Sequence, residues 1–234
     1  MPRASVLLPL LLLAGASRGA DSIDALVEQM QARPADLELG NRTRALCRTL
    51  RQTARCVDLI NQVAASHPAV PEARYQAALA YVDELPGHSI LKQGRLSSRS
   101  MDHASAVLAA RPDDWLALYI RGMNHLYWPL IFRHLDSAIA DLRRCATVVE
   151  ALPAPERKSY HALVYLALGD ALARKGEPAQ ARAAWQRAAE LDPGSAAAAA
   201  RLRLRDEEQA DFVAANRDLD KPIDTDLAFL WRMP

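Results

Sequence analysis

The amino-acid sequence predicts an all-α protein built from stacked helical hairpins. Glycine is scarce, with 9 residues in 234, and long stretches of Ala, Leu and Arg favour helices over sheets. Between Ala162 and Pro193, two amphipathic runs flank the turn sequence Lys-Gly-Glu-Pro at 175–178, where one helix must end and another begin. Further runs end at Pro68 and Pro112. A hairpin that recurs in this way is typical of a solenoid, in which each unit buries its apolar face against its neighbours.

The stretch 162–193 carries this pattern at full strength. Four residues of its first run are spaced i, i+3, i+4 and i+7, so they share one helix face. In its second run, alanines flank an aromatic residue, which suits two backbones in close approach. The order large, large, small, large, then Ala, aromatic, Ala and a final Pro resembles one tetratricopeptide repeat. The residues that carry this resemblance are Tyr165, Leu168, Gly169, Leu172, Ala181, Trp185, Ala188 and Pro193.

The resemblance implies a right-handed superhelical solenoid with a C-terminal capping helix. A repeat domain over 21–217 follows the N-terminal leader, and an apolar tail occupies 218–234. In the second hairpin we expect a long basic loop around Gly94, followed by a helix over 101–110. The expected hairpins lie at about 35–68, 70–112, 113–150 and 160–194, and the cap helix at 195–215.

The third hairpin departs from the family pattern. If Gly122 takes the small position, then Arg121 and His125 stand where the family places apolar or aromatic groups. The turn that follows contains the apolar stretch 128–132, Trp-Pro-Leu-Ile-Phe. Exposed, this stretch would mark a protein contact; buried, it would plug the edge of the solenoid. We favour the buried arrangement, because exposing such a stretch to water is costly.

Candidate binding residues follow from the resemblance, which places function on the concave face formed by the first helix of each repeat. The Lys and Asn positions with which some repeats clamp a terminal carboxylate are not reproduced. The predicted groove is instead apolar and aromatic, which suits an amphipathic helix, an extended peptide or a small apolar ligand. The alternative is that this stripe packs on a neighbouring helix as core. The candidate groove residues are Leu116, Tyr119, Met123, Leu126 and Tyr127, with Asp170 and Arg174 at the edge.

The N-terminus has the layout of a secretory signal peptide. Arg3 precedes an apolar run over 6–13, and small residues at 14–16 form a cleavage site. The apolar run is too short to span a bilayer as a helix. We expect cleavage of residues 1–16, or cleavage near residue 20, and a mature protein in the periplasm or outside the cell, without a membrane span.

Composition argues against several functions. Lys and Arg number 29 and Asp and Glu 28, which leaves no net field to attract nucleic acid. The six histidines show no HExxH spacing, and there is no GxSxG or phosphate-binding loop motif. We therefore predict a protein that is not an enzyme, with no cofactor and no metal site.

The three cysteines, Cys47, Cys56 and Cys145, can form at most one intrachain disulfide. In one continuous helix, Cys47 and Cys56 would lie on opposite faces about 13 Å apart along the axis. In a hairpin that turns near 51–53 they would face each other. Because the repeat interpretation requires such a turn, we predict a disulfide between Cys47 and Cys56 and a buried free thiol at Cys145.

These observations predict an exported interaction scaffold that binds a partner peptide or helix in its concave groove, within a bacterial envelope assembly. The alternative is a periplasmic binding subunit for a small apolar or amphipathic solute, associated with a transport system. A closed pocket around Tyr119, Met123 and Tyr127 would favour the second function, and an open groove of peptide width the first. The sequence does not identify the partner.

Overall fold

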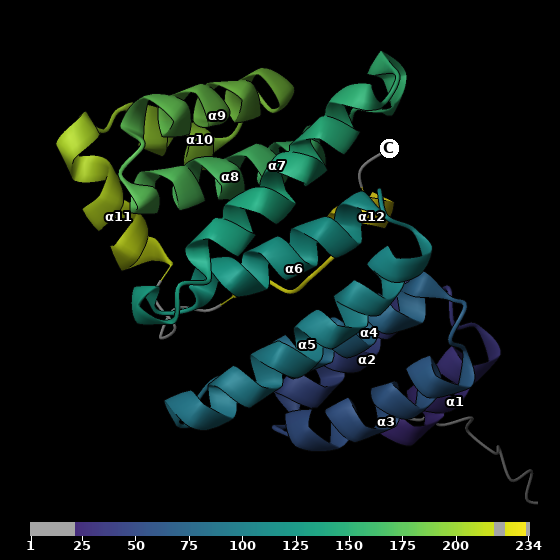
Figure 1. Ribbon diagram of the computed structural model, residues 1–234. Coiled ribbons are helices and arrows are strands. Elements are labelled where there is room, and N and C mark those ends of the chain that lie inside the picture. The colour runs from purple at the N-terminus through teal and green to yellow at the C-terminus, as the bar shows by residue number, and fades with distance from the viewer. Residues whose placement is uncertain (1–21, 218–222, 233–234) are drawn as a thin grey trace, which may run out of the picture.

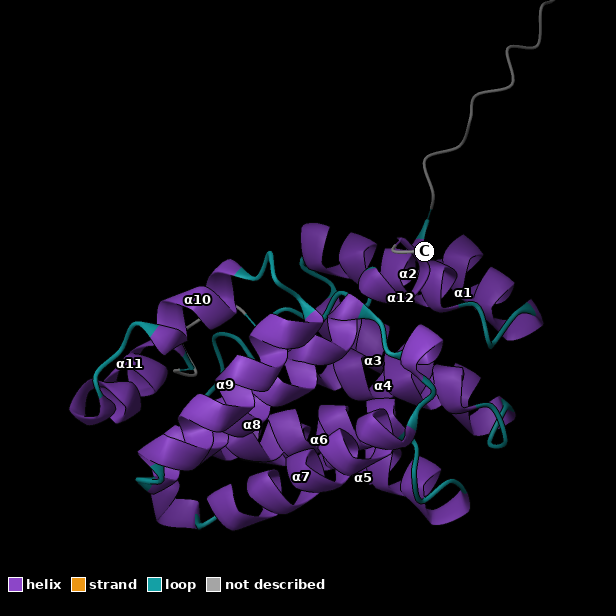
Figure 2. Ribbon diagram, turned by 90° about the horizontal axis from the view of Figure 1, so that it is seen from above, coloured by secondary structure: helices purple, strands orange, loops and turns teal. Residues whose placement is uncertain are grey.

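The computed structural model describes residues 22–217 and 223–232, and these residues form helices, turns and loops without a strand (Figure 2). The expected signal peptide lies outside the described residues. Among the helices described, none is long and apolar enough to cross a membrane. The α-helices are α1 Ile23–Ala32, α2 Leu37–Thr49, α3 Thr53–Ser66, α4 Pro71–Asp83, α5 Ile90–Ala110, α6 Trp115–Tyr127, α7 Leu135–Ala151, α8 Ala162–Lys175, α9 Pro178–Leu191, α10 Ala196–Leu202, α11 Gln209–Asn216 and α12 Phe229–Arg232.

Consecutive helices pack as antiparallel pairs that stack into a helical solenoid (Figure 1). The pairs are α2 with α3, α4 with α5, α6 with α7, and α8 with α9. The first helices of successive pairs, α2, α4, α6 and α8, also contact one another and form one layer. This confirms the all-α class and the solenoid that the recurring hairpins predict.

The pair α8–α9 shows why the spacing in 162–193 is required. Gly176 ends α8 in the left-handed conformation, at φ 82°, and Pro178 begins α9, where its missing N–H costs nothing. Gly169 lies where a Cβ would collide with the fully buried Trp185 ring. The close approach of the two helices therefore depends on that glycine.

The third pair keeps the same close approach but replaces apolar contacts with polar ones. A Cβ on Gly122 would lie 2.9 Å from Cγ of Leu142 on α7, so Gly122 takes the small position. Arg121 donates from Nε and Nη2 to both oxygens of Asp141, each at 2.7 Å. A bidentate ion pair between α6 and α7 thus stands in place of an apolar pair.

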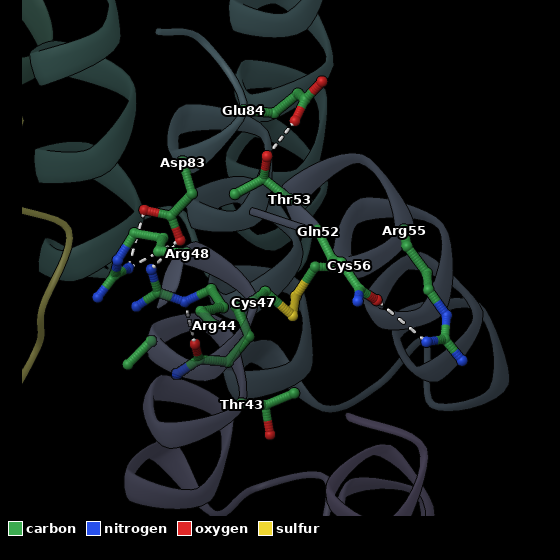
Figure 3. The surroundings of a disulfide bond; sticks show 12 residues. Thr43, Arg44, Cys47, Arg48, Gln52, Thr53, Arg55, Cys56, Asp83 and Glu84 are labelled. Carbon is green, nitrogen blue, oxygen red and sulfur yellow. Dashed lines mark hydrogen bonds and ion pairs between the residues drawn. A yellow bond between two sulfur atoms is a disulfide. The ribbon is translucent and has the colours of Figure 1, made fainter. Parts of the chain in front are cut away.

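In the first pair, the turn between the two helices lies between Cys47 and Cys56. Its turn occupies 50–52, between α2 and α3, and Arg51 adopts the left-handed conformation at φ 55° without a glycine. Cys47 and Cys56 face each other with their sulfurs at bonding distance and their Cα atoms 6.1 Å apart (Figure 3). The two cysteines thus lie at disulfide distance across a turn, as the hairpin requires, and Cys145 is a buried free cysteine.

Three expectations are wrong in detail. Helix α5 begins at Ile90, so the expected basic loop around Gly94 is helical: its serine run lies within a 21-residue helix. The expected cap helix over 195–215 is two helices, because α10 ends at Leu202 and α11 folds back onto α8. The stretch 128–132 is mainly exposed, with Leu130 at 55% and Ile131 at 80% exposure, although Trp128 packs inward, over Gly94.

Candidate functional site

The layer formed by α2, α4, α6 and α8 is crossed by the end of the chain. After α11, residues 223–227 run in extended form alongside α6 and lead into the short helix α12 (Figure 1). Residues 223–230 are here called the C-terminal segment. We call this surface of the four first helices the groove. The segment contacts both ends of the solenoid: Thr225 meets Arg44 on α2, and Phe229 meets Tyr160, which directly precedes α8.

A polar cluster lies at the α2–α4 end of the groove. Arg44 on α2 is fully buried, and its guanidinium donates to Gln76 Oε1 at 2.7 Å and to Asp83 Oδ2 at 2.8 Å. A further N–H donates to Asn41 Oδ1 at 2.7 Å. Arg48 reaches the same carboxylate, at 2.9 Å (Figure 3). Burial lowers the pKa of Arg44, against the raising effect of the Asp83 charge.

This cluster, here called the groove cluster (Arg44, Arg48, Gln76 and Asp83), is built by helix spacing. Arg44 and Arg48 are four residues apart, so they lie on one face of α2. Gln76 fits against Gly40, where a Cβ would overlap its side chain. A buried guanidinium is strongly unfavourable unless each N–H has a partner. The cluster therefore holds Arg44 in one orientation, with an N–H directed toward the C-terminal segment.

An apolar cavity of about 260 Å³ lies between the groove and the C-terminal segment. Three predicted groove residues, Tyr119, Met123 and Tyr127, line its wall from α6, and α4, α5 and α8 complete the helical side. Trp128 also lines the cavity, and its Nε1–H donates to Ser97 Oγ at 2.9 Å. The cavity thus lies between the aromatic residues that the sequence places on the concave face and the C-terminal segment that crosses this face.

The other predicted groove residues lie elsewhere. Leu116 and Leu126 are buried in the core between helix pairs and do not line the cavity. Asp170 is fully buried rather than at an edge, because it accepts from both Arg201 and Arg217. Arg174 donates to the main-chain oxygen of Leu126. These groups fix the last repeat and the C-terminal helices in place.

At the mouth of the cavity, exposed apolar side chains form a rim. Ile90 and Phe132 line the cavity and remain 50% and 44% exposed. Behind Phe132, Trp128 stacks on His134 with ring centroids 4.1 Å apart. The Nδ1 atoms of His125 and His134 lie 2.7 Å apart. Burial, and then the charge of His134, lower the pKa of His125 to about 4, so both rings are neutral near pH 7.

Sequence reasoning missed the groove cluster and the C-terminal segment. Arg44 and Arg48 belong to no motif that the sequence analysis identified, and their partner Asp83 lies 39 residues from Arg44. A signal was present in 223–229, Ile-Asp-Thr-Asp-Leu-Ala-Phe, whose polar and apolar residues partly alternate as in an extended chain with one face buried. Across the described residues, no group of three or more His, Cys, Asp or Glu side chains could hold a metal ion.

Comparison with known families gives a match to the tetratricopeptide repeat model over residues 162–195. This stretch of the chain is similar to a tetratricopeptide repeat. The match coincides with α8 and α9, whose glycine and tryptophan interlock as described. Comparison with curated proteins finds no match. Among solved structures, the crystal structure of YrrB, a TPR protein with an unusual peptide-binding site, is 16% identical, with a TM-score of 0.46 over 89% of this chain and 90% of that chain.

Proposed function

We propose that this repeat protein is an interaction scaffold that holds an extended segment of a partner protein in its groove. One observation carries the proposal: the groove cluster presents a buried, oriented guanidinium N–H that binds a main-chain oxygen of an extended chain, Thr225 O, at 2.7 Å. A main-chain oxygen is present in every peptide. Such a donor, with apolar walls beside it, is suited to binding a chain in extended form.

The aromatic wall supplies the second part of the interaction surface. Tyr119, Met123 and Tyr127 are partly buried and face the cavity, where apolar partner side chains can be enclosed. Aromatic residues in such desolvated positions contribute a large share of binding energy in protein complexes. The groove therefore combines a fixed polar contact with an adaptable apolar one.

The test is capture followed by reconstitution. The full chain is immobilised, partners from its native host are identified by mass spectrometry, and the bound region is synthesised as a peptide and titrated. Replacing Tyr119 and Tyr127 with Ala should weaken peptide binding at least about tenfold, a loss on the scale of one interface anchor. Arg205→Ala is the matched control, because Arg205 is exposed and pairs within its own turn. Equal binding by both variants would reject the groove as the site.

A second candidate function rests on the cavity itself. About 260 Å³ enclosed by apolar walls is close to the lower end of small-ligand pockets, so a small apolar or amphipathic solute is the alternative ligand. Native mass spectrometry of the full chain, purified from its host without detergent, distinguishes the two. A bound small molecule that is lost in Met123→Trp, which fills the cavity, would favour this alternative.

We also propose that the protein is exported and acts in a bacterial envelope. The support is the N-terminal pattern, Arg3 followed by the apolar run 6–13 and the small residues 14–16. The facing pair Cys47 and Cys56 is in keeping with an oxidising compartment. Cell fractionation with N-terminal sequencing tests this directly, and a mature protein that retains Met1 would reject it.

A further inference from the structure

The C-terminal segment lies in the groove as a ligand would. Its residues alternate: Thr225 and Leu227 are buried at 5% and 4% exposure, whereas Asp224 and Asp226 are exposed. This period of two is that of an extended chain with one face against a surface. The segment therefore meets the groove through side chains at every second position.

Polar contacts fix the register of the segment. Thr225 donates its hydroxyl proton to Asp83 Oδ1 at 2.5 Å, and its main-chain oxygen accepts from Arg44 Nη2 at 2.7 Å. Arg48 Nη2 donates to Asp226 Oδ1 at 2.6 Å. One residue thus uses both its side chain and its backbone, and the next supplies a charge. Sliding the segment by one residue would remove all three contacts and expose its buried face.

Apolar contacts continue along the segment toward α12. Leu227 belongs to the main core cluster, and Phe229 packs against it. The Phe229 ring lies 5.4 Å from the ring of Tyr160, between centroids. The segment therefore presents a hydroxyl residue, an acid, an aliphatic residue and, two positions later, an aromatic residue.

The groove cluster does not depend on the segment for its form. Without Thr225, Arg44 still donates to Gln76, Asp83 and Asn41. The contact of Arg48 with Asp226 is open to solvent, with side chains 31% and 48% exposed, and such exposed pairs add little to stability. Another chain can therefore take the place of the segment without rebuilding the site.

We propose that the C-terminal segment is a built-in competitor for the partner site, and that the partner displaces it with an extended segment of the same chemistry. The motif is a hydroxyl residue, then an acidic residue, then an aliphatic residue, with an aromatic residue two positions further on. This proposal rests on the proposed function. A tethered occupant is present at high effective concentration, so it weakens the apparent affinity of any competing peptide.

The experiment uses the full chain and a fluorescently labelled synthetic peptide of residues 221–232 as the probe. In Leu227→Glu, a charge at a buried position should drive the segment out of the groove. We expect this variant to bind the peptide at least roughly tenfold more tightly than the wild-type chain, by fluorescence anisotropy, because the tethered competitor is removed. Asp224→Asn, at an exposed position of the same segment, keeps the oxygen that accepts from the Asp226 N–H. It is the matched control and should behave as wild type.

A second peptide keeps the result interpretable. The same peptide with Glu at the position of Leu227 should not bind the Leu227→Glu chain, and hydrogen exchange should show the segment of that chain unprotected. Absent binding of the original peptide, or a segment that stays protected, would overturn the proposal. Either result leaves the proposed function standing if a peptide from a captured partner still binds the groove. If the partner peptide also fails to bind, both the competitor proposal and the proposed function are rejected.

Discussion

Replacing Gly169 with alanine tests the helix contact of the repeat through a single methyl group. A Cβ there would collide with the Trp185 ring and lie 3.0 Å from the main-chain oxygen of Ala181. The indole has no room to move, because it is fully buried and its Nε1–H donates to Asp170 Oδ1 at 3.1 Å. Asp170 is in turn held by two arginines. The added methyl must therefore push α8 and α9 apart.

The expected magnitude follows from two opposing effects. Overpacking a core costs about 1–3 kcal/mol, whereas Gly to Ala in a helix contributes about 1 kcal/mol of stability. Gly94→Ala in α5 is the matched control: its Cβ would lie 3.2 Å from the ring of Trp128, a milder contact with a side chain that is only half-buried and borders the cavity. Gly169→Ala should thus be less stable than Gly94→Ala by about 1–3 kcal/mol.

Urea denaturation of both variants, followed by far-ultraviolet circular dichroism, measures this difference in free energy of unfolding. In a chain of this size, 1 kcal/mol corresponds to a shift of about 2–4 °C in melting temperature. Equal stability of the two variants would refute the reasoning, because it would mean that the two helices do not meet at Gly169.

Three further outcomes are expected. Asp170→Ala should cost about 3–5 kcal/mol in urea denaturation, since it leaves two largely buried guanidinium groups without their carboxylate; a loss below about 1 kcal/mol would contradict the buried ion pair. The folded-state pKa of His125 is about 4, below the unfolded 6.5, so the unfolded chain binds the extra proton. Stability should therefore fall on acidification from about pH 6.5 to 4, and His125→Asn should make the fall in melting temperature across that window smaller, whereas an unchanged slope would reject the assignment. Peptide mapping without reductant should find Cys47 linked to Cys56 and Cys145 free, and reduction should cost about 2–3 kcal/mol for so short a loop; three free thiols would refute the pairing.

Much of the fold follows from local sequence patterns. The spacing around Gly169 and Trp185 specifies a close helix pair, and Pro178 marks where its second helix begins. The turn between Cys47 and Cys56 was deduced from the requirement for a hairpin, although the chain uses Arg51 there in place of glycine. These features were accessible because each depends on residues a few turns apart.

The features that the sequence did not reveal depend on distant partners. Ser97 falls in the stretch expected to form a basic loop, yet it lies within α5, and its hydroxyl accepts a hydrogen bond from Trp128. Arg121 departed from the repeat pattern, and only its pairing with Asp141 on the next helix explains it. Tyr119 was placed on the inner face, but nothing local indicated that the end of the chain would cover it. Side-chain pairing across tens of residues has no periodic signal.

The return of the chain end to the first repeat has a consequence for folding. In an open solenoid each repeat touches only its neighbours, so folding can begin anywhere and partly unfolded arrays are expected. Here Arg44 and Thr225, 181 residues apart, are joined, so the final contact forms only after every repeat is in place. Contacts between residues so far apart in the sequence slow folding. They also couple the unfolding of one end of the array to that of the other. The array should therefore unfold as one cooperative unit, and loss of the Arg44–Thr225 contact should let its two ends melt separately.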